Sequence, residues 1–295
     1  MSAQRDSIRT VSLIIPTYRR EQALVNCIES ARQQDWPSLE ILVIDQSESH
    51  EPDTLRYLCS LSHPVQLIHH TPPSAVGARN RGIGESTGDL LIFIDDDTTF
   101  ESSFVAAHVA AIEAGADVVQ GRVIEPGRGV SYRTQWMLPW LRVIGSNTYD
   151  KPGVTNTITG CNFSILRASQ KRVGFFDERF SGIVIREDAD FGARCSKAGL
   201  SMKFSADACL THHRDPSGGV DVGVRKARRE CEPDVLRNDL YFAHKHFPSL
   251  VVWQYRLRLK RRLMRIAQEH GSPTAAEIDE LLHSADQSAR ALLKR

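Results

Sequence analysis

The sequence lacks several features that mark secreted, membrane-spanning and zinc-binding proteins. Its six cysteines include no C-x-x-C pair and no regular spacing, which argues against a disulfide framework and a thiolate zinc site. The residues up to Thr10 are polar, and the first apolar run, residues 11–15, is too short for a signal-sequence core or a membrane span. We therefore expect a protein of a reducing compartment, the cytoplasm.

The sequence also lacks an excess of either charge. Lys and Arg number 37 and Asp and Glu number 36, so the overall charge gives no reason to expect nucleic acid as the main partner. With 41% hydrophobic and 25% charged residues, the composition is that of an ordinary globular protein. A chain of 295 residues can form one large α/β domain, or a smaller domain with an appendage.

The first part of the chain alternates short apolar runs with amphipathic segments, a pattern typical of a parallel sheet flanked by helices. Apolar runs, each followed by polar residues, predict strands at 11–15, 40–45, 65–70 and 89–95. Helical spacing predicts helices over 21–34, 74–84 and 104–114, and residues 118–123 resemble a further strand. This alternation predicts an α/β fold.

The second part of the chain divides into three kinds of segment. Residues 127–153 show no period, as expected of a long loop region over a site. Residues 157–167 and 202–213 predict strands, and residues 188–197 a helix. From 225 to 295 the pattern is mostly helical. We therefore predict a first domain over 1–215 and a helical C-terminal extension over 216–295, which forms a small second domain or packs back onto the first.

The strongest single feature is the run Asp95-Asp96-Asp97, directly after the apolar residues 90–94. Ligands of open α/β sheets bind beyond the carboxyl ends of the strands, where this run is expected. Three adjacent carboxylates repel one another unless a cation or a donor-rich ligand offsets the repulsion, so the run suggests a divalent metal site. The alternative is a solvated acidic turn that caps the next helix at Ser102 or Ser103.

Two later groups could complete such a site. Glu187 and Asp188 open a predicted helix, either as cap residues or with one of them as a general base for an acceptor hydroxyl. His212 and His213 follow the last predicted strand, where an imidazole could join carboxylates around a metal ion or be purely structural.

Three further segments also lie at the expected ligand edge. Residues 17–19 and Asp45 follow the first two strands, although Asp45 could equally serve a turn. Residues 77–82, GARNRG, combine small residues with donors suited to a nucleotide base or phosphate. The neighbouring segment 82–88, GIGESTG, does not match the dinucleotide-binding fingerprint G-x-G-x-x-G, because its third glycine comes one residue late.

Taken in order, seven motifs resemble those of the family 2 glycosyltransferases. They are PTYR (16–19), VIDQS (43–47), GARNRG (77–82), FIDDD (93–97), G-x-N (160–162), ED (187–188) and L-x-H (210–212). The resemblance covers roughly residues 10 to 215, and the ordered set is far more specific than any one motif. It implies a GT-A fold, a nucleotide-sugar donor, a Mn²⁺ or Mg²⁺ cofactor, and inverting transfer to a hydroxyl.

The resemblance also implies roles for individual residues. Pro16, Thr17, Tyr18, Arg19, Asp45 and Arg79 would hold the nucleoside, and Asp95 or Asp96 would contact ribose or donor sugar. Asp97 would be the principal metal ligand, with Asp95 and His212 beside it and His213 as the reserve. Asp188 would be the catalytic base.

The same resemblance sets the expected partners. UDP is the first candidate for the donor nucleotide, with GDP and dTDP as alternatives. A glycan or a lipid-linked molecule would be the acceptor, as in polysaccharide biosynthesis.

Two other classes of protein are alternatives to a transferase. A nucleotidyltransferase would carry a glycine-rich basic loop after the first strand, where this chain has PTYRREQ without glycine. A catalytically silent GT-A protein with a binding or scaffold role would show decay of the acidic sites. Asp95, Asp97 and Asp188 are all present, which favours an active enzyme.

Residues 256–265, RLRLKRRLMR, are strongly basic and interleaved with apolar residues. Such a segment could form an amphipathic helix that contacts anionic lipid, which would place the protein at the cytoplasmic face of a membrane. Alternatively, its apolar side packs on the first domain and its basic side is simply solvated.

Overall fold

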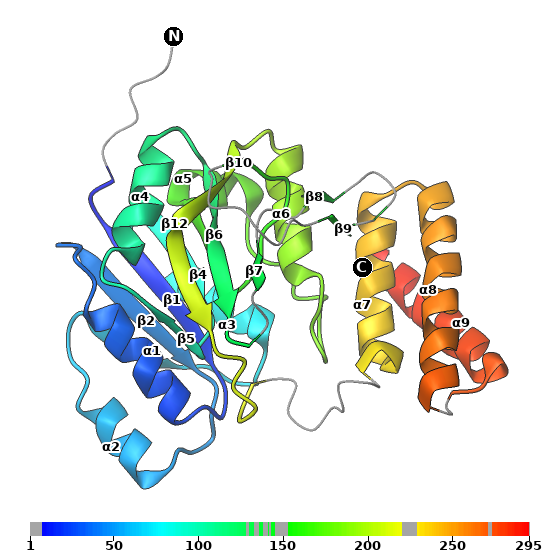
Figure 1. Cartoon of the computed structure of the whole chain (residues 1–295), viewed down its shortest axis with the longest axis horizontal. Coiled ribbons are helices and arrows are strands. Elements are labelled where there is room, and N and C mark those ends of the chain that lie inside the picture. Colours follow the sequence, from blue (N-terminus) through cyan, green and yellow to red (C-terminus); the bar gives the residue numbers. More distant parts are fainter. Residues whose placement is uncertain are drawn as a thin grey trace.

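The computed structural model describes residues 8–127, 130–132, 136–137, 141, 143–144, 153–219, 229–270 and 273–294. In these residues a ten-stranded mixed sheet is flanked by helices, and a group of three C-terminal helices lies beside it (Figure 1). The sheet and its helices position the site, and the C-terminal group closes one side of it.

Four parallel strands form one half of the sheet, in the order β3-β2-β1-β4. Their bounds are β1 Val11–Thr17, β2 Leu39–Asp45, β3 Val65–His69 and β4 Leu90–Ile94. These are the four strands predicted from the apolar runs. Every residue of β4 is buried, because helices cover both faces of a parallel sheet.

The other half of the sheet is mixed. Its strands are β5 Thr98–Phe100, β6 Val118–Glu125, β7 Val130–Tyr132, β10 Gly153–Val154, β11 Asn162–Leu166 and β12 Met202–His212. Strand β11 runs antiparallel between β4 and β6, and β12 then lies parallel to β6. The short strand β5 pairs with the end of β12, which brings the residues after β4 next to His212.

Helices pack on both faces of the sheet. They are α1 Gln22–Arg32, α2 Pro52–Cys59, α3 Ala75–Glu85, α4 Phe104–Glu113, α5 Arg167–Val173 and α6 Glu187–Lys197. One core cluster contains the buried faces of α1 and α4, and the other contains those of α3 and α6. The helices predicted over 21–34, 74–84, 104–114 and 188–197 are α1, α3, α4 and α6.

The C-terminal part is helical, as predicted, with α7 Pro233–His246, α8 Ser249–His270 and α9 Ala275–Leu293 after a short 3₁₀ turn, Arg229–Cys231. Buried residues of all three helices belong to the same cluster as α3 and α6. The apolar core therefore continues from the sheet into these helices.

The region expected to be a long loop, 127–153, contains the strand pair β8 Trp136–Met137 and β9 Val143–Ile144. Most of its other residues lie outside the described part of the chain. Nowhere in the described ranges is a helix both long and apolar enough to cross a bilayer. All six cysteines are free thiols.

Candidate active site

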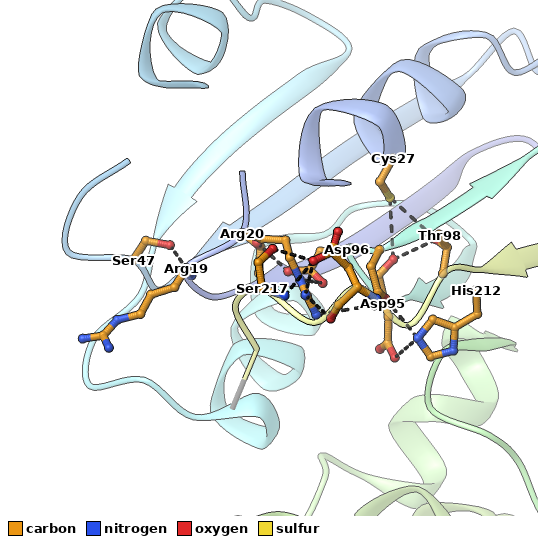
Figure 2. Close-up of polar contacts among 12 residues, drawn as sticks. Arg19, Arg20, Cys27, Ser47, Asp95, Asp96, Thr98, His212 and Ser217 are labelled. Carbon is orange, nitrogen blue, oxygen red and sulfur yellow. Dashed lines mark hydrogen bonds and ion pairs between the residues drawn. The ribbon is translucent and has the colours of Figure 1, made fainter. Parts of the chain in front are cut away.

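The three aspartates lie between β4 and β5, and each faces a different environment. Asp95 is about one third exposed (side chain 35%), whereas the side chains of Asp96 and Asp97 are almost fully buried. Figure 2 shows Asp95 on the side of His212 and Asp96 on the side of Arg20. The side chains of all three contact these and other site residues, and α4 has no side-chain cap, so the aspartates do not cap the helix that follows.

Asp96 joins β4 to the end of β1. It accepts a hydrogen bond from Thr17 Oγ1 at 2.7 Å and one from Arg20 Nε at 3.1 Å. Burial raises the pKa of Asp96 to about 6, against the opposing effects of Arg20 and Thr17. The position predicted to contact ribose or donor sugar is thus already bonded within the protein.

Asp97 is surrounded by donors. His212 Nε2 lies 3.0 Å from Asp97 Oδ1, and Asp97 Oδ2 accepts from the Asp215 amide at 3.0 Å and Arg20 at 3.4 Å. Burial acts to raise the pKa of Asp97, but His212, Arg20 and the Asp215 amide outweigh it and hold that pKa below its usual value. Asp97 is therefore ionised, as a metal ligand must be.

The two histidines point to different partners. His212 is buried against Asp97 and lies 3.9 Å from Asp95, whereas the ring of His213 meets Thr99 Oγ1 at 2.8 Å. This difference follows from the alternation of side chains along an extended segment. Burial acts to lower the pKa of His212, but the two carboxylates raise it overall.

The residues around Asp95 could hold a divalent cation. Ligand atoms of Asp95, Cys161 and His212 all lie within 4.8 Å of one another. A carboxylate and an imidazole suit Mn²⁺, while the buried Cys161 thiol has its pKa raised well above normal by burial, which disfavours the thiolate needed for coordination. The donor set fits a site that leaves positions open for ligand oxygens.

Glu187 and Asp188 are the first two residues of α6. Asp188 Oδ2 accepts from the Gly160 amide at 3.1 Å, while Glu187 Oε1 accepts from Arg79 at 3.0 Å. Burial, followed by the charge of Asp188, raises the pKa of Glu187. Asp188 thus stays close to the G-x-N segment and Glu187 turns toward Arg79.

Arg79, predicted to contact the nucleoside, lies beside the aspartate cluster. Its buried guanidinium lies between Glu187 and Asp95, 3.6 Å from the latter. Gly160 leaves room for it, because a Cβ at that position would lie 2.9 Å from an Arg79 nitrogen. Arg79 therefore links the aspartate cluster to the start of α6.

A cavity of about 550 Å³ brings these groups together. Asp95, His212, Asp188 and Arg79 line it. Residues of α7 and α8 line it as well, among them Val235, Leu236, Asp239, Leu259 and Arg262, together with Glu230. The helical C-terminal part of the chain therefore forms a wall of this cavity.

The predicted nucleoside residues lie together at the ends of β1 and β2. The Arg19 amide donates to Ser47 Oγ at 2.8 Å, and the Arg19 guanidinium is exposed above the Tyr18 ring. Asp45 accepts from the Ser47 amide at 2.9 Å and contacts His50, so it makes a turn contact as well as facing this edge. Pro16 and Thr17 form the last residues of β1.

The sequence did not single out Arg20, and it gave no role to Asn162 beyond its place in the G-x-N motif. Arg20 lies within 3.5 Å of Asp96, Asp97 and Asp215, and could have been suspected because three adjacent carboxylates need a counter-charge. Asn162 is fully buried and donates to the carbonyls of Arg122 and Ala208, so it fastens β11 to its neighbours. Asn162 thus fixes the position of the G-x-N segment through hydrogen bonds to β6 and β12.

Solved structures of glycosyltransferases share this architecture. The chain resembles a structure of GalNAc-T7 with UDP, GalNAc and Mn²⁺ (TM-score 0.68, 15% identity, 94% of this chain and 57% of that one). It also resembles a mannosyltransferase from Pyrobaculum calidifontis with GDP-Man and Mn²⁺ (TM-score 0.60, 16% identity, 98% and 86%). The fold is GT-A, as predicted.

The sequence comparison gives the family. The model of glycosyl transferase family 2 matches residues 12–173, more than half of the chain, and the chain belongs to this family. An uncharacterized glycosyltransferase of Escherichia coli, YibD, is 33% identical over 117 residues, which are 39% of this chain and 34% of that protein. The glycosyltransferase AglE of Haloferax volcanii is 25% identical over 215 residues, or 70% of this chain and 68% of that protein. The chain thus spans about a third of the first relative's length.

Proposed function

We propose that the chain transfers one sugar from a nucleoside-diphosphate donor to a hydroxyl of a glycan or lipid-linked acceptor, with inversion at the anomeric carbon. The observation that carries this proposal is the shared cavity, which Asp188, Asp95 and His212 all line. A base and a cation-type cluster in one cavity supply what the attacking and leaving groups of a displacement reaction need.

Asp188 is the proposed base. It takes the proton of the acceptor hydroxyl as that oxygen bonds to the anomeric carbon, while the bond from this carbon to the donor phosphate breaks and the diphosphate leaves. The Gly160 amide and Arg79 hold the start of α6 in place for this step. Direct displacement from the opposite face inverts the configuration.

Asp95, Asp97 and His212 are the proposed residues for a divalent cation, Mn²⁺ or Mg²⁺. When bound, such an ion neutralises charge that develops on the leaving diphosphate. The Mn²⁺ named for two structurally similar transferases supports this assignment. Arg20 stabilises Asp97 without lining the cavity itself.

Residues 16–19 and Asp45 would hold the nucleoside, at the strand ends where nucleotides bind to open α/β sheets. Asp95, which lines the cavity, would contact the ribose or the donor sugar. UDP is the first candidate for the donor nucleotide, because UDP accompanies one structural neighbour. GDP is an alternative, because GDP-Man accompanies another neighbour, and dTDP is tested beside them.

Calorimetric binding of UDP, GDP and dTDP, with and without Mn²⁺ or Mg²⁺, tests the proposal. We expect one nucleotide to bind more tightly with metal, and Asp97→Ala to lose that enhancement. Asp188→Asn should bind the same nucleotide normally but lose transfer, whereas the exposed control Asp207→Asn should keep both. If no nucleotide binds under any condition, the protein is a catalytically silent GT-A scaffold and the proposed activity is wrong. If Asp188→Asn transfers normally, the base is another residue.

A further inference from the structure

We propose that one face of α8 docks on a lipid surface rich in anionic headgroups. This outer face of α8 consists of Leu250, Trp253, Leu257, Arg261, Met264 and Arg265. These six residues fall within one third of the helix circumference, because they recur at three- and four-residue steps.

The outer face exposes large apolar side chains. Leu250 is 65% exposed, Trp253 58%, Leu257 40% and Met264 37%. The opposite side of the same helix, with Val252, Tyr255, Leu259 and Leu263, is buried in the core. The helix therefore has a second apolar stripe that packing onto the protein does not use, and Figure 1 shows α8 farther from the sheet than α7.

The charges of α8 divide in the same way. Arg256 and Lys260 pair with Asp286 and Asp279 of α9, and Arg262 pairs with Glu230. Within the described residues, exposed Arg261 and Arg265 have no acidic partner. The cations that remain without a counter-charge are thus those next to the apolar stripe.

This combination selects a lipid surface as the occupant. Apolar side chains, Trp included, enter the boundary between headgroups and acyl chains, while neighbouring arginines attract anionic headgroups. A shallow hollow of about 450 Å³, lined by Gln254, Leu257, Arg258 and Arg261, lies within this region. Guanidinium groups beside a hollow suit the phosphate of a headgroup.

Docking would place the active-site cavity near the lipid. Leu259 and Arg262 of α8 line the same cavity as Asp188. A lipid-borne acceptor could then reach the cavity without leaving the surface. This last consequence rests on the proposed transferase function, whereas the docking itself does not.

Flotation of the full chain with vesicles tests the docking. We expect the protein to float with phosphatidylcholine vesicles that contain phosphatidylglycerol, and much less with phosphatidylcholine alone. Arg261→Gln with Arg265→Gln should lower the partition coefficient about 25-fold, or roughly fivefold per charge. Trp253→Ser with Leu257→Ser should lower it by at least roughly tenfold.

Matched controls lie on other surfaces. Leu55→Ser with Phe175→Ser removes exposed apolar side chains, and Arg56→Gln with Lys171→Gln removes exposed cations, so neither pair should change flotation. Equal flotation of the α8 variants and the wild type would overturn the proposal.

A wild-type protein that does not float with any of these vesicles would also overturn it. So would a dimer, detected by light scattering, that the Trp253→Ser substitution dissociates, since the outer face would then bind a second copy. The assay needs neither donor nor turnover, and Asp188→Asn should float normally. Its failure is therefore distinguishable from failure of the proposed reaction.

Discussion

Arg20 is the counter-charge of the aspartate cluster. Its guanidinium is 8% exposed and contacts Asp96, Asp97 and Asp215, so its positive charge offsets repulsion among carboxylates that burial has brought together. The adjacent Arg19 has the same side chain but is 54% exposed and lies 3.8 Å from Glu48. The two neighbours therefore offer a matched comparison.

We predict that Arg20→Met lowers the free energy of unfolding by about 3–5 kcal/mol, because removing one partner leaves buried carboxylates uncompensated. Arg19→Met should change it by less than about 0.5 kcal/mol, as expected for an exposed pair. Urea denaturation without metal measures both. Equal effects of the two substitutions would show that Arg20 is not the counter-charge.

His108 gives the fold a pH dependence that is separate from the site. Its ring is fully buried between Ser164 Oγ at 2.9 Å and Asn162 Oδ1 at 3.0 Å, and burial lowers its pKa to about 4. In the unfolded chain His108 has a pKa of about 6.5, so it binds a proton as the pH falls below that value. In the folded protein it stays neutral until the pH reaches about 4. Stability therefore falls as the pH falls through this window.

We predict that the wild type loses about 3 kcal/mol more than His108→Gln between pH 7 and pH 4. Comparing the two proteins removes the contribution of carboxylates common to both. Denaturant midpoints at several pH values measure the difference. Parallel pH profiles would mean that His108 titrates normally in the folded protein.

Two of the three glycines of helix α3, Gly82 and Gly84, differ in the space around them. A Cβ at Gly82 would lie 2.4 Å from Cγ2 of Ile14 in β1, while a Cβ at Gly84 would meet nothing within 4 Å. Gly82 therefore lets α3 pack closely on the sheet, and Gly84 contributes nothing comparable.

We predict that Gly82→Ala lowers the free energy of unfolding by about 1–3 kcal/mol, because the β-branched Ile14 is buried and cannot move aside cheaply. Gly84→Ala should raise it by about 0.5 kcal/mol through helix propensity. Thermal or urea unfolding checks both signs. A stabilising Gly82→Ala would show that the helix–sheet spacing is adjustable.

The elements that the sequence predicted are those with a strong local pattern. The buried runs of β1 and β4 and the apolar face of α1 each contain their own signal, so their bounds agree with prediction to within about two residues. Strand β5 is only three residues long and forms because β12 lies beside it. No local pattern could have predicted it.

The same distinction separates the site residues. Asp95 to Asp97 and His212 stand out because they directly follow or end strands. Arg20 meets Asp96 across 76 positions of sequence, and Leu259 reaches the cavity from a helix whose docking only tertiary packing decides. Which arginine balances the aspartates, and which helices wall the cavity, depends on these distant contacts.

The apolar core continues from the sheet into α7–α9, which the sequence predicted either to form a small second domain or to pack back onto the first. Leu282 of α9 is 4% exposed and belongs to the cluster that includes the sheet residue Phe93. Leu293, on the same helix, is 41% exposed. Trp36 lies at the other face of the sheet, packed against the second cluster, and can report on that face.

We predict that Leu282→Ala lowers the stability of the whole chain by about 2–5 kcal/mol, because a cavity in α9 weakens a core shared with the sheet. In a protein that retains Trp36 alone, its fluorescence and the helical circular dichroism should shift to the same lower denaturant midpoint. Leu293→Ala should leave both midpoints unchanged within about 0.5 kcal/mol. If helical signal were lost first while the Trp36 transition stayed in place, α7–α9 would be an independent domain, and the cavity wall they form could open without unfolding the sheet.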